Sequence, residues 1–256
     1  MVRRRSALVP AGVALLAAAF GCRTSTVSVA FTPDIGDRYV YRYEITATIT
    51  REVQGSDPEV IALDTELTAD QQVRAITESG ARIRATLTRE SGAPRTAIVV
   101  VDRAGSLSGV ELIEGLSASA FGLADAALVP THLEGPPDGP LELGDEWSIG
   151  GATREGTGRL ERLGVVDDVD VAVVRSSLTQ QLQESVDARD SDTDLSGTLR
   201  SGALTSYDLT DGAIRRSRSW SSGTLDAHLA PPIGVQAEPV EATLTYDISV
   251  RVTRLG

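Results

Sequence analysis

The chain has a single cysteine, Cys22, and it contains no lysine and no asparagine. Because there is no second cysteine, no intramolecular disulfide can form, and the fold must depend on its apolar core. Only two histidines, His132 and His228, supply imidazoles that titrate near neutral pH. No stretch of 18 apolar residues occurs anywhere, so the sequence predicts no transmembrane helix.

Basic side chains are few compared with acidic ones. The sequence has 24 basic residues against 36 Asp and Glu, a net charge of −12. Three of the arginines stand at residues 3–5, so the chain without residues 1–21 keeps 21 basic residues and has a net charge of −15. A surface of this sign repels nucleic acid and anionic headgroups. We therefore expect neither nucleic-acid binding nor a polybasic membrane patch.

The first 21 residues have the composition of an export signal. Three arginines precede an apolar stretch over residues 7–20, which is too short to span a bilayer as a stable helix. The sequence Ala19-Phe20-Gly21-Cys22 that follows resembles the lipobox of bacterial lipoproteins, in which the cysteine is acylated and becomes the first residue of the mature chain. This resemblance implies a signal peptide over 1–21, lipid attachment at Cys22 and a lipidated tether over 22–30. An ordinary signal peptide cleaved nearby is the alternative.

The lipid would then be the membrane anchor of the protein. Each buried methylene contributes about 0.8 kcal/mol, so two or more acyl chains bind much more firmly than one. Arg23 follows the cysteine, where some bacteria with two membranes use Asp to retain lipoproteins on the inner membrane. We expect an exported protein on the outer membrane if the host has one, and otherwise on the outer face of the cytoplasmic membrane.

Long stretches of alternating apolar and polar residues dominate the rest of the chain. In residues 39–49 and 242–252, every second residue is apolar. Strict alternation predicts strands with one buried face. Similar patterns predict further strands at 63–75, 81–88, 96–101, 160–163, 165–178, 199–209, 213–220 and 225–229. The predicted fold class is mainly β, with a large curved antiparallel sheet that is half-barrel or barrel-like.

One segment has a different pattern. Apolar residues recur at helical spacing over 109–129, which predicts one mid-chain helix. The proline-rich residues 130–140 follow as a rigid connector. The β-rich domain would span 31–256, with possible related halves at 31–129 and 141–256.

Two short matches relate these halves. Gly36-Asp37-Arg38-Tyr39 and Gly144-Asp145-Glu146-Trp147 are separated by 108 residues, and the segment 102–105 matches 208–212 at a similar separation. The common spacing indicates a duplicated β-meander, although Gly-Asp is frequent in β-turns.

The length of the predicted strands has a consequence for packing. Strands of twelve residues make a sheet about 40 Å tall, whereas one helix covers only about 30 Å by 10 Å. The sheet must therefore close on itself, pack on a second sheet, or leave an apolar trough. Together with the lipobox, this pattern is similar to uncharacterised bacterial lipoproteins with β-rich domains. More distantly it is similar to the Lol-type carriers and the mycobacterial glycolipid-carrying lipoproteins. That resemblance implies a half-barrel around an acyl-binding cavity, but it identifies no binding residue.

Catalytic motifs are lacking. Neither a Gly-x-Ser-x-Gly elbow nor an HExxH motif occurs, and 36 acidic residues make any chosen carboxylate pair arbitrary. His132 lies in the connector and His228 lies in a predicted strand. We predict that the protein is not an enzyme and has no catalytic residue.

Two acidic segments resemble metal sites only in part. Asp190-Ser191-Asp192-Thr193-Asp194 alternates carboxylates as calcium loops do, but Leu195 and Ser201 stand where an EF-hand needs Gly and Glu. We interpret residues 187–194 as a solvated acidic loop and Asp167-Asp168, with Asp170, as a turn. The sequence predicts no metal and no cofactor.

The expected function is that of a membrane-anchored exported lipoprotein that binds an apolar ligand, such as a lipid or acyl chain, without catalysis. The alternative is a structural envelope lipoprotein or a protein-interaction scaffold, and a hydrolase is the least favoured reading. Tyr39, Tyr41 and Tyr43 would line a ligand trough in the first case and form sheet core in the second.

Overall fold

The computed structural model describes residues 26–78, 80–90, 92–105, 107–113, 135–151, 153–188, 191–229 and 239–256. Within these ranges the regular structure consists of strands, and no described helix is long and apolar enough to cross a membrane. The strands are β1 (Val27–Ser28), β2 (Arg38–Val53), β3 (Glu59–Thr77), β4 (Gly80–Arg89), β5 (Arg95–Asp102), β6 (Leu107–Ile113), β7 (Pro140–Leu141), β8 (Glu146–Gly151), β9 (Arg154–Val166), β10 (Val169–Ala188), β11 (Ser191–Asp208), β12 (Ile214–Leu229) and β13 (Val240–Arg254).

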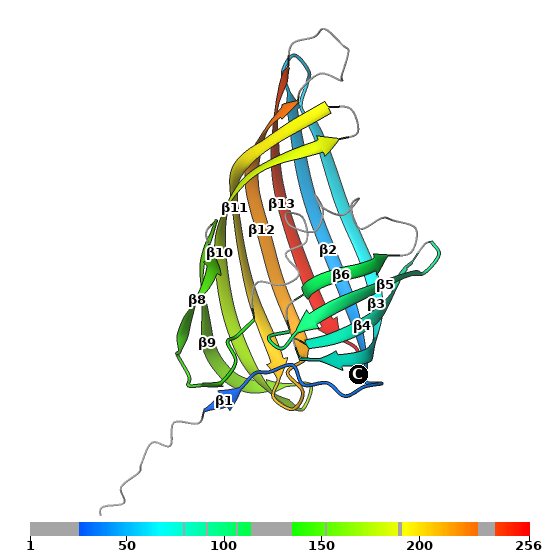
Figure 1. Ribbon diagram of the computed structural model, residues 1–256, viewed down its shortest axis with the longest axis vertical. Coiled ribbons are helices and arrows are strands. Elements are labelled where there is room, and N and C mark those ends of the chain that lie inside the picture. Colours follow the sequence, from blue (N-terminus) through cyan, green and yellow to red (C-terminus); the bar gives the residue numbers. More distant parts are fainter. Residues whose placement is uncertain are drawn as a thin grey trace, which may run out of the picture.

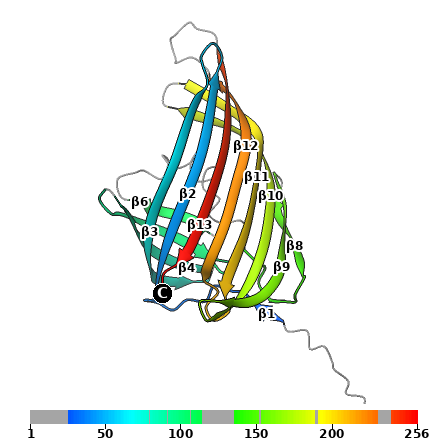
Figure 2. The same cartoon turned by 180° about the vertical axis from the view of Figure 1, so that it is seen from behind.

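Eleven of these strands form one antiparallel sheet in the order β6-β5-β4-β3-β2-β13-β12-β11-β10-β9-β8. The sheet curves round into an open barrel (Figures 1 and 2). Neighbouring strands follow one another in sequence except where β2 pairs with β13. No pairing between described strands joins β6 to β8. The prediction of a large curved antiparallel sheet is confirmed, and this sheet is not closed.

The strands differ greatly in length, so the barrel has a lower half that the short strands reach and an upper half that they do not. Strands β2, β3 and β10–β13 have 15 to 20 residues, or about 50–65 Å. In contrast, β4, β5 and β6 have 10, 8 and 7 residues. We call the end at which β2 begins and β13 ends the base. The short strands stand beside the base end of β3, so the wall is more complete near the base than above it (Figure 1).

The predicted alternation of buried and exposed residues is confirmed in the two central strands. Tyr39, Tyr41 and Ala47 of β2 are buried, whereas Arg42 and Thr46 between them are exposed. The same alternation runs along β13, whose buried inward residues are Ala242, Tyr246, Ile248, Val250 and Val252. One face of the sheet therefore forms the apolar interior, and the other face is polar.

The predicted helix over 109–129 is wrong in its first five residues, which belong to β6. Two register shifts between β5 and β6 explain the misleading spacing. Val110 and Ile113 are three residues apart, yet they lie opposite Val99 and Ala97, which are two apart. An irregular strand thus imitates a helical period. The rest of the predicted helix, and most of the predicted connector, lie outside the described residues.

Bulges and pairings correct several other boundaries. A register shift after Val73 places Ala75 opposite the outward Arg82, so Ala75 leaves the predicted alternation. Residues 213–220 and 225–229 were expected to be separate strands, but most of both lies in the continuous strand β12, which contains Gly223.

Two segments predicted to be irregular are also strand in part. In the segment 187–194, which was predicted to be a loop, residues 187–188 and 191–194 are strand, because β10 and β11 pair up to Ala188 and Ser191. Val27 and Ser28, within the predicted tether, form β1 and pair with β7. In both cases a backbone partner from a remote or adjacent strand decides the conformation, and composition gives no sign of it.

The segment between β1 and β2 ties several strands together at the base. The backbone N–H of Phe31 donates to the carbonyl of Arg103, and that of Thr32 donates to the carbonyl of Asp211, at 2.8 and 2.9 Å. Gly212 has a φ of 70°, and a Cβ there would lie 2.0 Å from the carbonyl oxygen of Ala30. Only glycine therefore allows this segment to lie so close to the turn between β11 and β12.

Candidate ligand trough

The upper half of the inner face carries apolar side chains that the short strands do not cover. Leu63 of β3 lies opposite Ala47 of β2, which in turn lies opposite Ile248 of β13, so all three share the inner face. Ala47 and Ile248 are buried, but Leu63 is 50% exposed. Ile61, two residues before Leu63 on the same face, is 49% exposed.

We call the inner face on this level the upper trough. Its larger residues come from the long strands and are Ile49, Ile61, Leu63, Leu182, Leu195, Leu199, Leu225 and Tyr246. The five leucine and tyrosine residues on β10–β13 belong to one buried apolar cluster. The trough wall is thus largely apolar and comes from strands far apart in sequence. An ion pair between Arg51 Nη2 and Glu59 Oε2, at 2.7 Å, lies on the same inner face.

Two strand edges border the upper trough. Among the described residues, Glu59–Glu66 of β3 pair with β2 alone, because pairing with β4 begins at Leu67. On the other side, Leu182–Ala188 of β10 pair with β11 alone, because the pairing with β9 ends at Gln180. The two walls of the trough therefore end in edges that no described strand extends.

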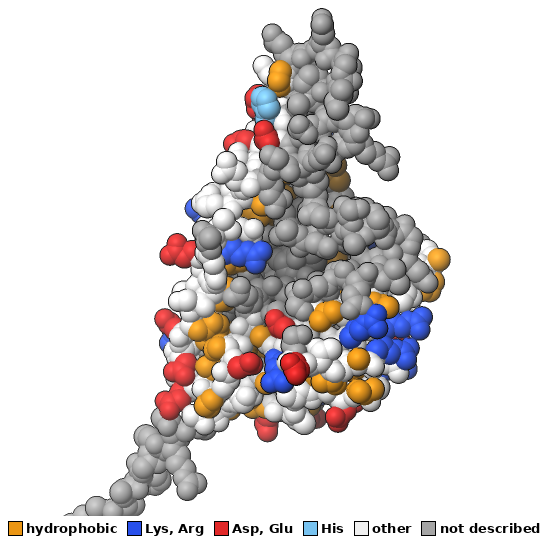
Figure 3. All heavy atoms as spheres, in the orientation of Figure 1, with side chains coloured by type: hydrophobic (Ala, Val, Ile, Leu, Met, Phe, Trp, Pro, Cys, Tyr) orange, Lys and Arg blue, Asp and Glu red, His pale blue; other side chains and the backbone are white. Residues whose placement is uncertain are grey.

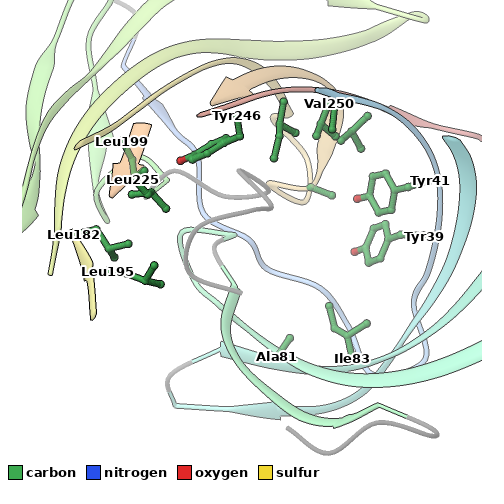
Figure 4. Close-up of a cluster of buried hydrophobic side chains, with 14 of the residues drawn as sticks. Tyr39, Tyr41, Ala81, Ile83, Leu182, Leu195, Leu199, Leu225, Tyr246 and Val250 are labelled. Carbon is green, nitrogen blue, oxygen red and sulfur yellow. The ribbon is translucent and has the colours of Figure 1, made fainter. Parts of the chain in front are cut away.

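Tyr246 places a polar group in this apolar surface. Its ring is buried, and its hydroxyl points toward Leu199 and Leu225 (Figure 4). Among the residues that the structure describes, the hydroxyl has no hydrogen-bond partner. Burial raises the pKa of this hydroxyl. The nearby Ser221 hydroxyl lowers the pKa in part, although the two groups do not meet hydrogen-bond geometry. A buried hydroxyl without a partner is costly and is a ready donor to a ligand oxygen.

Hydroxyl groups that β11 and β12 place on the inner face bond to one another. The Ser201 hydroxyl donates to Ser221 Oγ at 3.0 Å, and Thr205 Oγ1 lies 2.9 Å from Ser217 Oγ. These pairs satisfy the polar groups that β11 and β12 bring into the interior. Tyr246 differs from them in having no such partner.

The lower half of the barrel is filled by aromatic side chains. The ring centroids of Tyr39 and Tyr41 are 6.5 Å apart, those of Tyr41 and Tyr43 are 6.3 Å apart, and Phe31 lies 5.9 Å from Tyr39. The cavity beside Tyr41, Tyr43 and Ile83 has a volume of only about 50 Å³. That volume accommodates a few water molecules and no acyl chain. The tyrosine row is therefore sheet core at this level.

Charged groups at the base are buried beside this row. Asp208 Oδ2 lies 2.8 Å from Arg215 Nη2, and Arg254 Nη1 lies 3.2 Å from Asp211 Oδ2. The Arg254 guanidinium also stacks 4.8 Å from the centre of the Tyr39 ring. Burial by itself raises the pKa of Asp208, but the Thr210 backbone N–H and Arg215 outweigh it and lower the pKa. The cluster is matched in charge and serves the structure of the base.

The residues singled out from sequence as possible catalysts or ligands do not converge. His228 lies on the outer face, with Nδ1 2.6 Å from Glu241 Oε1, and both side chains are exposed. Asp167 and Asp168 form the predicted turn, with φ of 50° and 62°. In the part of the chain that the structure describes, no three His, Cys, Asp or Glu side chains are grouped to hold a metal ion. Cys22, His132 and Asp190 lie outside the described residues.

The alternating pattern of the sequence predicts that Leu63 and Tyr246 face inward, but it marks neither of them as a ligand-binding residue. The half-exposed state of Leu63 depends on how far β4 extends along β3, and no local pattern gives that distance. The one hint of this exposure in the sequence was a difference in length between two consecutive predicted strands, 63–75 and 81–88.

Comparisons with known proteins do not identify a relative. No family model and no curated protein matches the chain. Among solved structures, a loop L8 deletion mutant of OmpT, an outer membrane protein of Vibrio cholerae, is 7% identical, with 85% of this chain and 100% of that chain covered and a TM-score of 0.24. OccK11 (OpdR) of Pseudomonas aeruginosa is 9% identical, with 90% and 99% covered and a TM-score of 0.22. Scores this low do not support a shared fold or function.

Proposed function

We propose that the chain is an exported lipoprotein, anchored through Cys22, that binds an apolar ligand in the upper trough without catalysis. The observation that carries the binding function is the half-exposed state of Ile61 and Leu63 on the inner face. Inner-face aliphatic residues normally bury their surface, and each gains about 1.5–3 kcal/mol when fully buried. A ligand that lies along the trough would cover them.

The chemistry of the trough selects the ligand class. Its wall is largely aliphatic, and the Tyr246 hydroxyl has no hydrogen-bond partner among the described residues. A ligand with an acyl body and one ester or carboxyl oxygen would satisfy both features. The cavity beside Tyr41 and Tyr43, of about 50 Å³, is too small for an acyl chain, so the proposed ligand lies above it.

Neighbouring residues of β3 provide a matched test. Ile61 faces the trough, whereas Val60 lies on the outer face and is 63% exposed. We expect the full-length protein, purified from its own host, to retain an extractable lipid in native mass spectrometry. Ile61→Glu should abolish that retention and Val60→Glu should not. Tyr246→Phe should weaken it by roughly 5- to 30-fold, the value of one hydrogen bond to a buried donor.

The anchor requires its own measurement. Palmitate labelling should modify the wild type and should be lost in Cys22→Ser. If the protein carries the covalent lipid but no extractable lipid, in wild type and both variants alike, it is an anchored scaffold with no ligand. That outcome would contradict the binding function and leave the anchor intact.

A further inference from the structure

The base of the barrel exposes five large apolar side chains, Ile35, Ile76, Leu143, Val165 and Leu255, with exposed fractions between 38% and 70%. They come from four separate turns or strand ends and from the chain end, so no single loop accounts for them. Val165 lies next to the turn that joins β9 to β10, and Ile76 lies next to the turn that joins β3 to β4.

Backbone hydrogen bonds hold these residues in place. The turns that contain Ile35 and Leu143 are each closed by a backbone hydrogen bond, from the N–H of Asp37 to the carbonyl of Asp34 at 3.1 Å and from the N–H of Asp145 to the carbonyl of Glu142 at 3.0 Å. The N–H of Leu255 donates to Val40 O at 2.7 Å. The apolar side chains therefore project from a base whose backbone is already ordered.

The chain enters the fold at this same end. Strand β1 pairs with β7, and Figure 1 shows β1 at the lower end of the molecule. Five residue steps separate Cys22 from Val27, a span of at most about 18 Å. A lipid on Cys22 would hold the base close to the bilayer, so the inference that follows rests on the anchor proposed above.

We propose that the base is a membrane-contact surface, in which these five side chains enter the interfacial layer of the bilayer that holds the lipid anchor. Several weak apolar contacts from one ordered surface add to the affinity of an acyl chain and fix the orientation of the protein. The upper trough then opens at the end away from this membrane.

The charge of the base indicates which lipids it contacts. Carboxylates adjoin two of the apolar residues: Asp34 precedes Ile35, and Glu142 precedes Leu143. Near Val165, the carboxylate of Asp167 is paired with Arg216 at 2.7 Å. Apolar, acidic and basic side chains are intermixed over the lower part of the molecule in Figure 3. Negative headgroups would repel these carboxylates, so the surface fits zwitterionic lipids.

The single cysteine makes this testable in the full-length lipidated protein. Acylation of Cys22 consumes its thiol, so a cysteine introduced elsewhere is the only site for an environment-sensitive fluorophore. Leu143→Cys and Val165→Cys place the fluorophore at the base, and Val60→Cys, equally exposed, places it at the opposite end. Each labelled protein is incorporated into phosphatidylcholine vesicles that contain spin-labelled lipid.

We expect fluorescence at positions 143 and 165 to be quenched at least about twofold more than at position 60, and quenching to weaken when phosphatidylglycerol is added. Equal quenching at all three positions, in protein that floats with the vesicles, would overturn the contact surface and leave the anchor intact. Failure of every variant to float would overturn both. Stronger quenching with phosphatidylglycerol would overturn the assignment to zwitterionic lipid.

Discussion

Asp37 and Asp145 make the same hydrogen bonds in two turns that are 108 residues apart. In each, Oδ2 accepts from the backbone N–H three residues earlier, Asp34 or Glu142, at 2.8 Å. Their own carbonyls accept from the backbone N–H groups of Val73 in β3 and Leu160 in β9, at 2.9 and 3.0 Å. The preceding glycines have φ of 99° and 94°. This agreement supports the hypothesis that the two halves are a duplicated β-meander.

The two aspartates should contribute equally to stability. Asp37→Ala and Asp145→Ala each remove a charged acceptor from a backbone N–H, so each should lower the free energy of unfolding by about 1–2 kcal/mol. Urea denaturation measures the change, and Asp64→Ala, on the exposed outer face of β3, is the control. A loss confined to one of the two turns would mean that they are not equivalent.

The two faces of β13 should differ sharply. Ile248 is buried on the inner face, so Ile248→Ala should lower the free energy of unfolding by about 2–5 kcal/mol. Ser249→Ala, the adjacent change on the outer face, should lower it by less than about 1 kcal/mol. Chemical denaturation of both variants distinguishes the faces. Equal losses would show that β13 is buried on both sides.

Asp208 should make the fold sensitive to acid. Because its pKa is lowered in the folded state, its contribution to stability is present above the unfolded pKa of about 3.9 and disappears as the pH falls through the lower folded value. Asp208→Asn leaves Arg215 and Arg254 without this partner and should lower the free energy of unfolding at pH 7 by about 3–5 kcal/mol. Unfolding curves at pH 7, 5 and 3 should show a smaller pH effect in the variant than in the wild type.

All five tyrosines should resist ionisation in the folded protein. Burial raises the pKa of Tyr43 and Tyr207 to about 12, and it raises those of Tyr39, Tyr41 and Tyr246 as well. The native protein should therefore show little tyrosinate absorbance at pH 10.5, whereas the urea-unfolded chain should titrate near pH 10.

The same shifts have a consequence for stability. A raised tyrosine pKa means that the unfolded state ionises first, so stability should be full below about pH 10 and should fall as the pH rises above it. Tyrosinate absorbance that appears near pH 10 while circular dichroism remains native would contradict the burial of the tyrosine row.

Local patterns in the sequence were sufficient for the two central strands and their faces. In β2 and β13, strict alternation specified which residues are buried, because successive strand side chains point to opposite sides. The turn at Asp167 and Asp168 was also predictable, since short polar side chains tolerate the left-handed region. The composition and spacing of residues 1–22 raised the hypothesis of a lipid anchor independently of any fold.

The tertiary structure decided what depends on partners remote in sequence. Pairing of β2 with β13 places the break in the sheet between β6 and β8. Residues 109–113, which have a helical pattern, belong to β6, and two register shifts with β5 account for their spacing. Leu63 is half-exposed because β4 does not extend along β3 as far as Leu63. The exposure of Leu63, the unpaired strand edges and the lack of a described partner for Tyr246 each depend on several strands together. One strand's sequence cannot contain them, because each depends on which strand lies alongside and on how far that strand extends.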